Sequence, residues 1–393
     1  MLPLQGVTVV SLEQAVAAPF ATRQLADLGA RVIKIERPIV GDFARNYDDK
    51  VSGMSSHFVW CNRSKESLTL DLKKEEATQI LDALLLEADV FIQNLAPGAV
   101  ERLGYGSEAL REKYPKLIIC NISGYGNNGP YRNKKAYDLL VQCEAGLVSI
   151  TGTEEVPSKA GISIADIAAG MYAYSGILSA LIARHTSGGQ GMIVEVSMLE
   201  ALGEWMGYPL YYSTYSGEEP SRSGASHATI YPYGPFPAKD GKMIFIGIQN
   251  EREWVQFCTL VLELPDLARD IRFNSNSKRV EAKHQLQVKI NHTFNTLTTE
   301  EIMDRLDQAQ IANARLNTVR EFAEHPQLQA RNRWSQVDSP SGPIKVLIPP
   351  VTLEGVDTVM NPIPSVGEHS ELVLKELGFE AITIQQWREQ GVI

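Results

Sequence analysis

The stretch "VTVVSLEQAVAAPFATRQLADLGARVIKIE", residues 7–36, predicts the fold of the first half of the chain. An apolar run at residues 7–12 is typical of a strand buried on both faces. Residues 19–29 then have helical spacing and end at Gly29, and a second apolar run follows at residues 31–36. Strand, helix and strand in this order form a βαβ unit, whose two strands are parallel.

The same alternation continues beyond this unit. Further strands are expected at residues 67–72, 89–95, 116–124 and 192–198, and helices at residues 74–88, 106–114 and 167–185. Alternating strands and helices predict a parallel sheet with helices on both faces. The fold class is therefore α/β, with a large Rossmann-like domain.

Composition limits the classes of function. The chain has 393 residues, which favours two structural units, and its net charge of −10 argues against binding of nucleic acid or of an anionic membrane. We find no signal-peptide pattern and no apolar run of bilayer length, so a cytoplasmic protein without membrane contact is expected. The seven histidines lack the spacing of metal ligands, so no metal site is expected.

The second half of the chain is less regular. Residues 204–226 are aromatic and polar without clear periodicity, which indicates a linker. Residues 227–320 predict a smaller α+β unit, with a β-hairpin around residues 239–241 and helices within residues 251–263 and 298–309. Residues 321–393 combine proline-rich loops with a C-terminal helical segment.

The segment "GYGNNG", residues 124–129, has the GxGxxG spacing of a dinucleotide site and follows an expected strand. In such a site the third glycine lies in a helix whose N-terminus holds the pyrophosphate. Here the next residues are "PYRNKK", a proline and a basic stretch rather than a helix start. A glycine-rich loop is therefore favoured over a nicotinamide or flavin site.

Asp166 is the one carboxylate in "GISIADIAAG", residues 161–170. As a helix N-cap it would accept hydrogen bonds from free N–H groups, and the helix dipole would lower its pKa. Alternatively, its small neighbours leave space for a substrate, and a desolvated carboxylate can attack an activated acyl group. The residues alone leave both interpretations open.

Basic residues follow several of the expected strands. Because loops after parallel strands meet at one edge of the sheet, these side chains could together bind a ligand with several phosphates. The alternative is that they are ordinary solvated surface residues. The residues concerned are Arg37, Lys73, Arg102, Lys134 and Lys135.

Six segments together resemble the class III CoA-transferases, and the resemblance covers essentially the whole chain. They are "LADLGARVIKIERPIVGD" (25–42), "NRSKESLTLDLK" (62–73), "ADVFIQNLAPGAVERLGY" (88–105), "ISGYGNNGPY" (122–131), "ADIAAGMYAYSGILSALIARHTSGGQG" (165–191) and "VEVSMLEA" (194–201). The resemblance implies a large CoA-binding domain built from residues 1–203 and 321–393, a linker at 204–226 and a small domain at 227–320. It also implies an interlocked homodimer.

The resemblance also implies roles for individual residues. The aspartate nucleophile of the family matches Asp166, which would form covalent aspartyl intermediates. No permanently bound cofactor is implied, because coenzyme A and succinyl-CoA are substrates. The positions that match CoA-binding residues are Val16, Ala17, Arg37, Leu70, Lys73, Asn94, Leu95, Ala96, Arg102, Lys135, Tyr137 and Asp138.

The segment "SGASHATIYPYGPF", residues 223–236, resembles the branch that acts on small dicarboxylates. This implies a transferase that moves CoA from succinyl-CoA to itaconate, with Arg45, Arg222 and His227 as candidate ligands of the distal carboxylate. Mesaconate or citramalate as acceptor remains an alternative. A 2-methylacyl-CoA racemase is disfavoured because Tyr137 stands where racemases have a histidine, and a non-catalytic CoA-binding protein also remains open.

Overall fold

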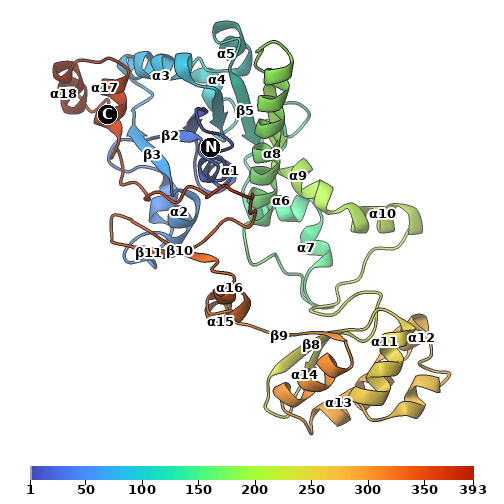
Figure 1. Ribbon diagram of the computed structural model, residues 1–393. Helices are drawn as coiled ribbons and strands as arrows, with labels where there is room; N and C mark the ends of the chain where they lie inside the picture. Colours follow the sequence, from blue (N-terminus) through green and yellow to red (C-terminus); the bar gives the residue numbers. More distant parts are fainter. Residues whose placement is uncertain (1) are drawn as a thin grey trace. The chain divides into compact units, whose positions relative to one another are not determined.

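The computed structural model describes residues 2–393, which form two compact units (Figure 1). The large unit comprises residues 2–147, Ala160–Tyr208 and Ala330–Ile393, and the small unit comprises Val148–Lys159 and Pro209–Gln329. Both units are therefore built from segments that are distant in the sequence.

The large unit contains a six-stranded sheet in the order β3-β2-β1-β4-β5-β6, and every pair of neighbouring strands is parallel. The βαβ unit predicted for residues 7–36 is confirmed as β1 (Thr8–Leu12), α1 (Ala17–Asp27) and β2 (Arg31–Glu36). This strand order is that of dinucleotide-binding folds. The other strands are β3 (Lys65–Thr69), β4 (Val90–Gln93), β5 (Ile118–Ser123) and β6 (Ile193–Ser197).

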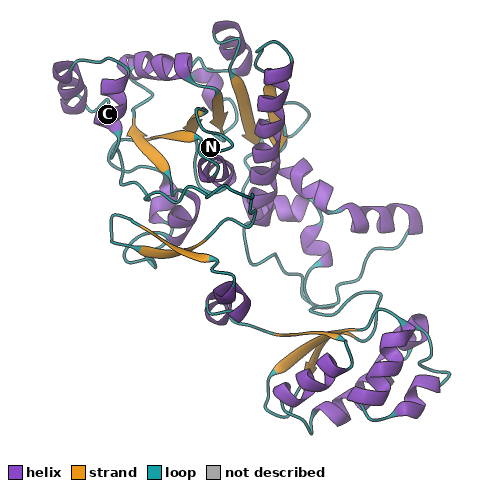
Figure 2. Cartoon of the chain, in the orientation of Figure 1, coloured by secondary structure: helices purple, strands orange, loops and turns teal. Residues whose placement is uncertain are grey.

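Helices cover both faces of this sheet, as the apolar strands predict (Figure 2). Val9 faces a core shared with α1, α8 (Ile164–Thr186) and α9 (Met198–Trp205). The next residue, Val10, faces the opposite core, which contains residues of α3 (Glu75–Glu87), α17 (Ser370–Glu376) and α18 (Ala381–Glu389). Successive strand residues thus point to opposite faces.

Helix α8 is the central helix of the first of these cores. Within residues 2–393 it is also the one helix whose length and hydropathy match a membrane span. In the large unit it packs against α1, α9, β5 and β6. At Gly170 the approach of α1 is so close that an added Cβ would lie 2.7 Å from the carbonyl oxygen of Ala17.

The C-terminal segment covers the outer edge of the sheet. The N–H groups of Ser67 and Thr69 in β3 donate to His369 Nδ1 and Ser370 Oγ. An exposed edge strand would otherwise leave such groups unpaired. The same segment contains the antiparallel pair β10 (Trp334–Val337) and β11 (Ile344–Leu347), where the sequence predicts only proline-rich loops.

The small unit has the predicted hairpin, formed by β7 (Tyr233–Pro237) and β8 (Met243–Gly247) and extended by β9 (Ala312–Arg315). The predicted helix near residue 298 is confirmed as α14 (Thr299–Gln308), which begins at a capping box. The segment 204–226, which the sequence indicates as a linker, contains the helix α10 (Gly207–Ser216).

The remaining helices are short connecting segments, apart from the twelve-residue α13 in the small unit. They are η1 (Phe43–Asn46), α2 (Ser56–Cys61), α4 (Ala99–Arg102), α5 (Ser107–Lys113), α6 (Asp138–Glu144), α7 (Leu147–Ile150), α11 (Glu251–Gln256), η2 (Phe257–Val261), η3 (Pro265–Arg269), α12 (Asn276–Glu281), α13 (Lys283–Phe294), α15 (Val319–Ala323) and α16 (Pro326–Ala330).

Candidate functional site

A cavity of about 1890 Å³ lies in the large unit, at the carboxyl edge of the parallel sheet. The strand order reverses between β1 and β4, which is where ligands bind in open α/β sheets. Its volume exceeds the roughly 300–1,000 Å³ of most small-ligand sites, so it suits a long ligand. Segments that line it include residues 14–17, 35–38, 70–73, 93–101, 121–124 and 132–139, together with Asp166.

The predicted CoA-binding residues gather at this cavity. All of them line it except Arg102, which is exposed on α4. The Arg102 guanidinium lies beside Gly98, a lining residue, because a Cβ added there would be 2.8 Å from Arg102 Nη1. The lining members are Val16, Ala17, Arg37, Leu70, Lys73, Asn94, Leu95, Ala96, Lys135, Tyr137 and Asp138. "GYGNNG" is followed by loop until α6, so it is not the start of a helix.

The loop between β1 and α1 is fixed from two sides. The side chain of Asn94 accepts from the N–H of Gln14 at 2.8 Å and donates to its carbonyl oxygen at 2.9 Å. Ala15 has a φ of 61°, a left-handed conformation that is unusual for alanine, and its N–H donates to Asp42 Oδ1 at 3.2 Å. These bonds hold one wall of the cavity in place.

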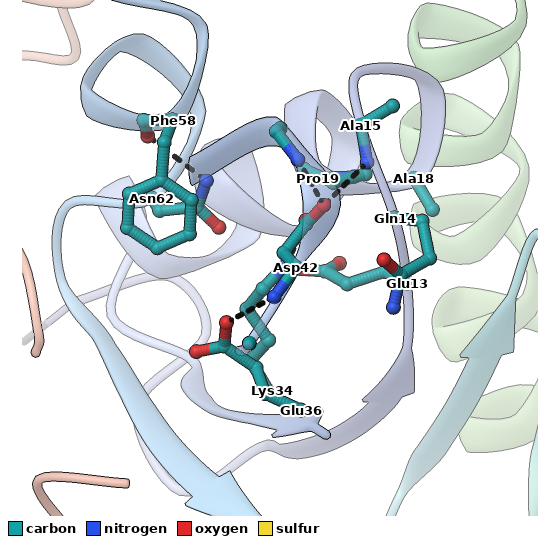
Figure 3. Close-up of polar contacts among 12 residues, drawn as sticks. Glu13, Gln14, Ala15, Ala18, Pro19, Lys34, Glu36, Asp42, Phe58 and Asn62 are labelled. Carbon is teal, nitrogen blue, oxygen red and sulfur yellow. Dashed lines mark hydrogen bonds and ion pairs between the residues drawn. The ribbon is translucent and has the colours of Figure 1, made fainter. Parts of the chain in front are cut away.

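Asp42 belongs to a buried ion network that sequence reasoning missed. Lys34 Nζ lies 2.8 Å from Asp42 Oδ2 and 3.3 Å from Glu13 Oε1, and Lys65 Nζ lies 2.7 Å from the same Glu13 oxygen. In Figure 3, Asp42 lies between Ala15 and Glu36. A signal was present for Lys34, which falls within the strand expected at residues 31–36, because a lysine buried there must be paired. Lys65 precedes the strand expected at residues 67–72 and carried no such signal.

The electrostatics of this network follow from burial and pairing. Burial lowers the pKa of Lys65 to about 8, even though Glu13 opposes this shift. Burial alone would also lower the pKa of Lys34, but Glu13, Asp42 and Glu36 outweigh it and raise that pKa. Lys34 is therefore charged, and it holds the carboxylate that orients the Ala15 loop.

Asp166 lines the cavity from the first turn of α8. The N-cap interpretation of Asp166 is wrong: Ser163 occupies the N-cap, and the free N–H of Ala165 is satisfied by Asp138 Oδ1 at 2.8 Å. The expectation of a lowered pKa is wrong too. Burial and the nearby charge of Asp138 raise the pKa of Asp166 to about 7.

Two further residues near Asp166 were not predicted. Tyr47 lines the cavity, and burial together with the charges of Asp42 and Asp166 raises its pKa to about 12. His57 lines the same cavity, with its ring edge-on to Tyr47 at 5.4 Å between centroids. No motif marks either residue in the sequence. Tyr137, which replaces the racemase histidine, also lines the cavity and is 69% exposed.

Of the three candidate ligands of a distal carboxylate, Arg45 belongs to the large unit but is not among the residues that line the cavity. Arg45 forms a bidentate ion pair with Glu36, with N–O distances of 2.8 and 2.7 Å, and stacks on Phe58. Arg222 and His227 belong to the small unit. There Arg222 donates to backbone carbonyl oxygens, among them that of Thr153, and His227 stacks on Tyr233.

Within residues 2–393 we find no group of three or more histidine, cysteine, aspartate or glutamate side chains arranged to hold a metal ion. What the cavity does offer is a carboxylate, Asp166, whose pKa is raised to about 7, in a lining that also includes basic residues such as Lys73 and Lys135. Such an arrangement can perform nucleophilic chemistry on an acyl group.

Comparisons with known proteins agree with this chemistry. The family model for CoA-transferase family III matches residues 4–370. The human succinyl-CoA:glutarate CoA-transferase is 30% identical over 100% of this chain and 90% of its own length. The succinyl-CoA:mesaconate CoA-transferase of Haloarcula hispanica is also 30% identical, over 95% of this chain and 96% of its own. A CAIB/BAIF family protein from Brucella suis has a crystal structure with a TM-score of 0.86 and 31% identity, covering 96% of this chain and 99% of its own.

Proposed function

The chain belongs to the class III CoA-transferase family, and we propose that it moves coenzyme A from succinyl-CoA to a small dicarboxylate, itaconate or a close relative such as mesaconate, citramalate or glutarate. The observation that carries the proposal is the placement of Asp166, half-buried and titrating near pH 7, in a cavity long enough for an acyl-CoA. Relatives named for succinyl-CoA and for dicarboxylate acceptors support the choice of substrates.

In the proposed reaction, a carboxylate oxygen of Asp166 attacks the thioester carbonyl carbon of succinyl-CoA. The carbon–sulfur bond breaks, which leaves an aspartyl succinyl anhydride and CoA thiolate. The thiolate attacks the aspartyl carbonyl carbon, so succinate leaves and an aspartyl-CoA thioester forms. The acceptor carboxylate then attacks this thioester to give a new anhydride, and the released thiolate takes the acceptor acyl group and frees Asp166.

The first step needs the carboxylate form of Asp166, and the anhydride and thioester intermediates that follow need exclusion of water. The raised pKa supports this role, because a poorly hydrated carboxylate is a stronger nucleophile than a solvated one. The cavity-lining CoA-binding candidates are proposed to hold the pantetheine and phosphates, with Arg102 at the rim. We also propose that the protein works as a cytoplasmic, interlocked homodimer with no resident cofactor.

The test is a panel of free acids incubated with succinyl-CoA. We expect transfer of CoA to dicarboxylates, and we expect Asp166→Ala and Asp166→Asn to lower the rate by at least about 10³-fold, since the nucleophile is lost. Incubation with donor alone should add mass to the peptide that contains Asp166. Good turnover without any adduct there would count against the covalent scheme.

The racemase alternative has a separate measurement. A racemase would exchange the α-proton of a branched acyl-CoA for deuterium, whereas the transferase would not. This measurement matters because His57 lies in the cavity even though Tyr137 replaces the racemase histidine. A non-catalytic CoA-binding protein would neither transfer CoA nor exchange protons.

A further inference from the structure

One wall of the cavity is formed by the segment that contains η1 and the start of α2. Three ring side chains from it line the cavity: Phe43, Tyr47 and His57. Phe43 and Tyr47 pack with their ring centroids 5.8 Å apart, and Tyr47 meets His57 edge-on at 86°. Asp166 lines the same cavity as these three rings, and its charge acts on Tyr47.

His57 contributes an imidazole ring to this wall, and one of its two ring nitrogens already faces a carboxylate. Nδ1 is buried without a hydrogen-bond partner and faces Asp48 Oδ2 at 3.6 Å. Asp48 is held in turn by the N–H and hydroxyl of Ser56 and by the N–H of Lys50. The His57 side chain is 41% exposed, so the nitrogen left for a ligand is Nε2.

Most of the arginines and lysines in and around the cavity already have partners or another proposed role. The guanidinium of Arg45 is taken by Glu36, and that of Arg37 donates to the carbonyl oxygen of Gly41. Lys134 is paired with Glu144. The remaining lysines and arginine that line the cavity are Lys73, Lys135 and Arg132, on the segments after β3 and β5, and the two lysines are already proposed to bind CoA.

We propose that His57 binds the non-reacting carboxylate of the acid through Nε2, while Asp48 faces Nδ1, and that this contact makes the enzyme select dicarboxylates over monocarboxylates. This inference rests on the proposed CoA-transferase function and names the residue that recognises its substrate class. A histidine between two carboxylates is in the imidazolium form when it donates a hydrogen bond to each. A charge-assisted bond of this kind is stronger than a neutral one.

The test compares two five-carbon acceptors, glutarate and valerate, which differ in the second carboxylate. Succinyl-CoA at one fixed, saturating concentration serves as the donor for both acceptors, so the two kcat/KM values differ only through the acceptor. We expect His57→Leu to lower kcat/KM for glutarate by about 10- to 100-fold and to change kcat/KM for valerate by less than about threefold. His57→Gln, whose amide N–H can replace Nε2–H, should restore part of the loss for glutarate.

His284→Leu is the matched control, because His284 is exposed on α13 of the small unit, and it should change neither value. An equal loss for both acceptors in His57→Leu would overturn the inference, since it would indicate a structural role. Unchanged selectivity would overturn it as well. If the wild-type protein transfers CoA to no acid, the proposed function itself fails. If the wild-type protein does transfer CoA and His57→Leu keeps the same selectivity, only the role of His57 fails.

Discussion

The carboxylates of Asp138 and Asp166 both lie at the start of α8 and have different roles. Asp138 caps α8 by accepting the N–H of Ala165, so Asp166 is not needed as a cap and can face the cavity. The same proximity makes the ionised form of Asp166 costly, in addition to the cost of burial. The cap therefore helps to set the protonation of the proposed nucleophile.

This arrangement predicts a pH dependence. The pKa of Asp166 is raised from 3.8 to about 7, so the reactive carboxylate form is lost as the pH falls through 7. We expect kcat/KM for succinyl-CoA to rise about tenfold per pH unit below this value and to level off above it. In Asp138→Asn the repelling charge is absent, so the acidic limb of the pH profile, where kcat/KM rises with pH, should move to lower pH.

Glu108→Gln is the control for this experiment, because Glu108 lines the cavity but does not act on the pKa of Asp166. Its acidic limb should coincide with that of the wild-type protein. A limb that stays near pH 7 in Asp138→Asn would show that Asp138 does not set the titration. Asp138→Asn also alters the bond to Gln142, so its folding should be checked by circular dichroism.

The sequence could point to Asp166 because its neighbours are small and apolar, which is a local property. The sequence could not identify Asp138 as the cap of α8. Asp138 lies 27 positions before Ala165 and reaches its N–H only because α6 packs against α8. The same holds for the network of Glu13, Lys34 and Lys65, because Glu13 directly follows β1, Lys34 lies within β2 and Lys65 begins β3. Contacts of this kind depend on tertiary structure rather than on periodicity.

At the level of elements, α8 illustrates how a helix can tolerate an unfavourable residue. Glycine costs about 1 kcal/mol relative to alanine in a helix interior, yet Gly170 lies in the middle of the α1 contact. A Cβ there would meet the Ala17 carbonyl oxygen at 2.7 Å and Phe20 at 3.0 Å. The glycine is therefore explained by the close approach of the two helices.

We expect Gly170→Ala to lower the free energy of unfolding by about 1–3 kcal/mol, because overpacking outweighs the gain in helix propensity. Gly203→Ala in α9 is the matched control: nothing lies within 4 Å of its added Cβ, so stability should rise by up to about 1 kcal/mol. Urea unfolding of both variants measures the difference. A stabilised Gly170→Ala would contradict the close packing of α1 and α8.

Helices and strands with a clear apolar pattern could be predicted from the sequence, and those with a weak pattern could not. Strands β1, β2, β4 and β5 follow from short apolar runs, because both of their faces are buried. The β10–β11 pair has alternating, half-exposed residues between prolines, so its apolar signal is diluted. Helix α10 has no buried residue within the chain, which removes the periodicity that would have marked it in the sequence.

At the scale of the whole molecule, the large unit is completed by the end of the chain. Val392 is fully buried and belongs to the same core as Leu70, and its carbonyl oxygen accepts the N–H of Asp71 at 2.7 Å. Gly391 itself lines the cavity. The family resemblance implied that the last segment returns to the large domain, whereas periodicity alone could not show which strand it would reach.

Because Val392 packs beside the loop of residues 70–73, a substitution at the C-terminus should alter binding of the donor. Val392→Ala removes two buried methyl groups, so the free energy of unfolding should fall by about 1–3 kcal/mol. Because the loop of residues 70–73 then loses part of its support, kcat/KM for succinyl-CoA should fall several-fold, while kcat/KM for the acceptor should be unchanged. Val351→Ala, at a residue that is 62% exposed in the same C-terminal segment, should alter neither quantity. If Val392→Ala is destabilised but keeps its wild-type kcat/KM for succinyl-CoA, the C-terminus supports the fold alone and does not position the CoA-binding loop.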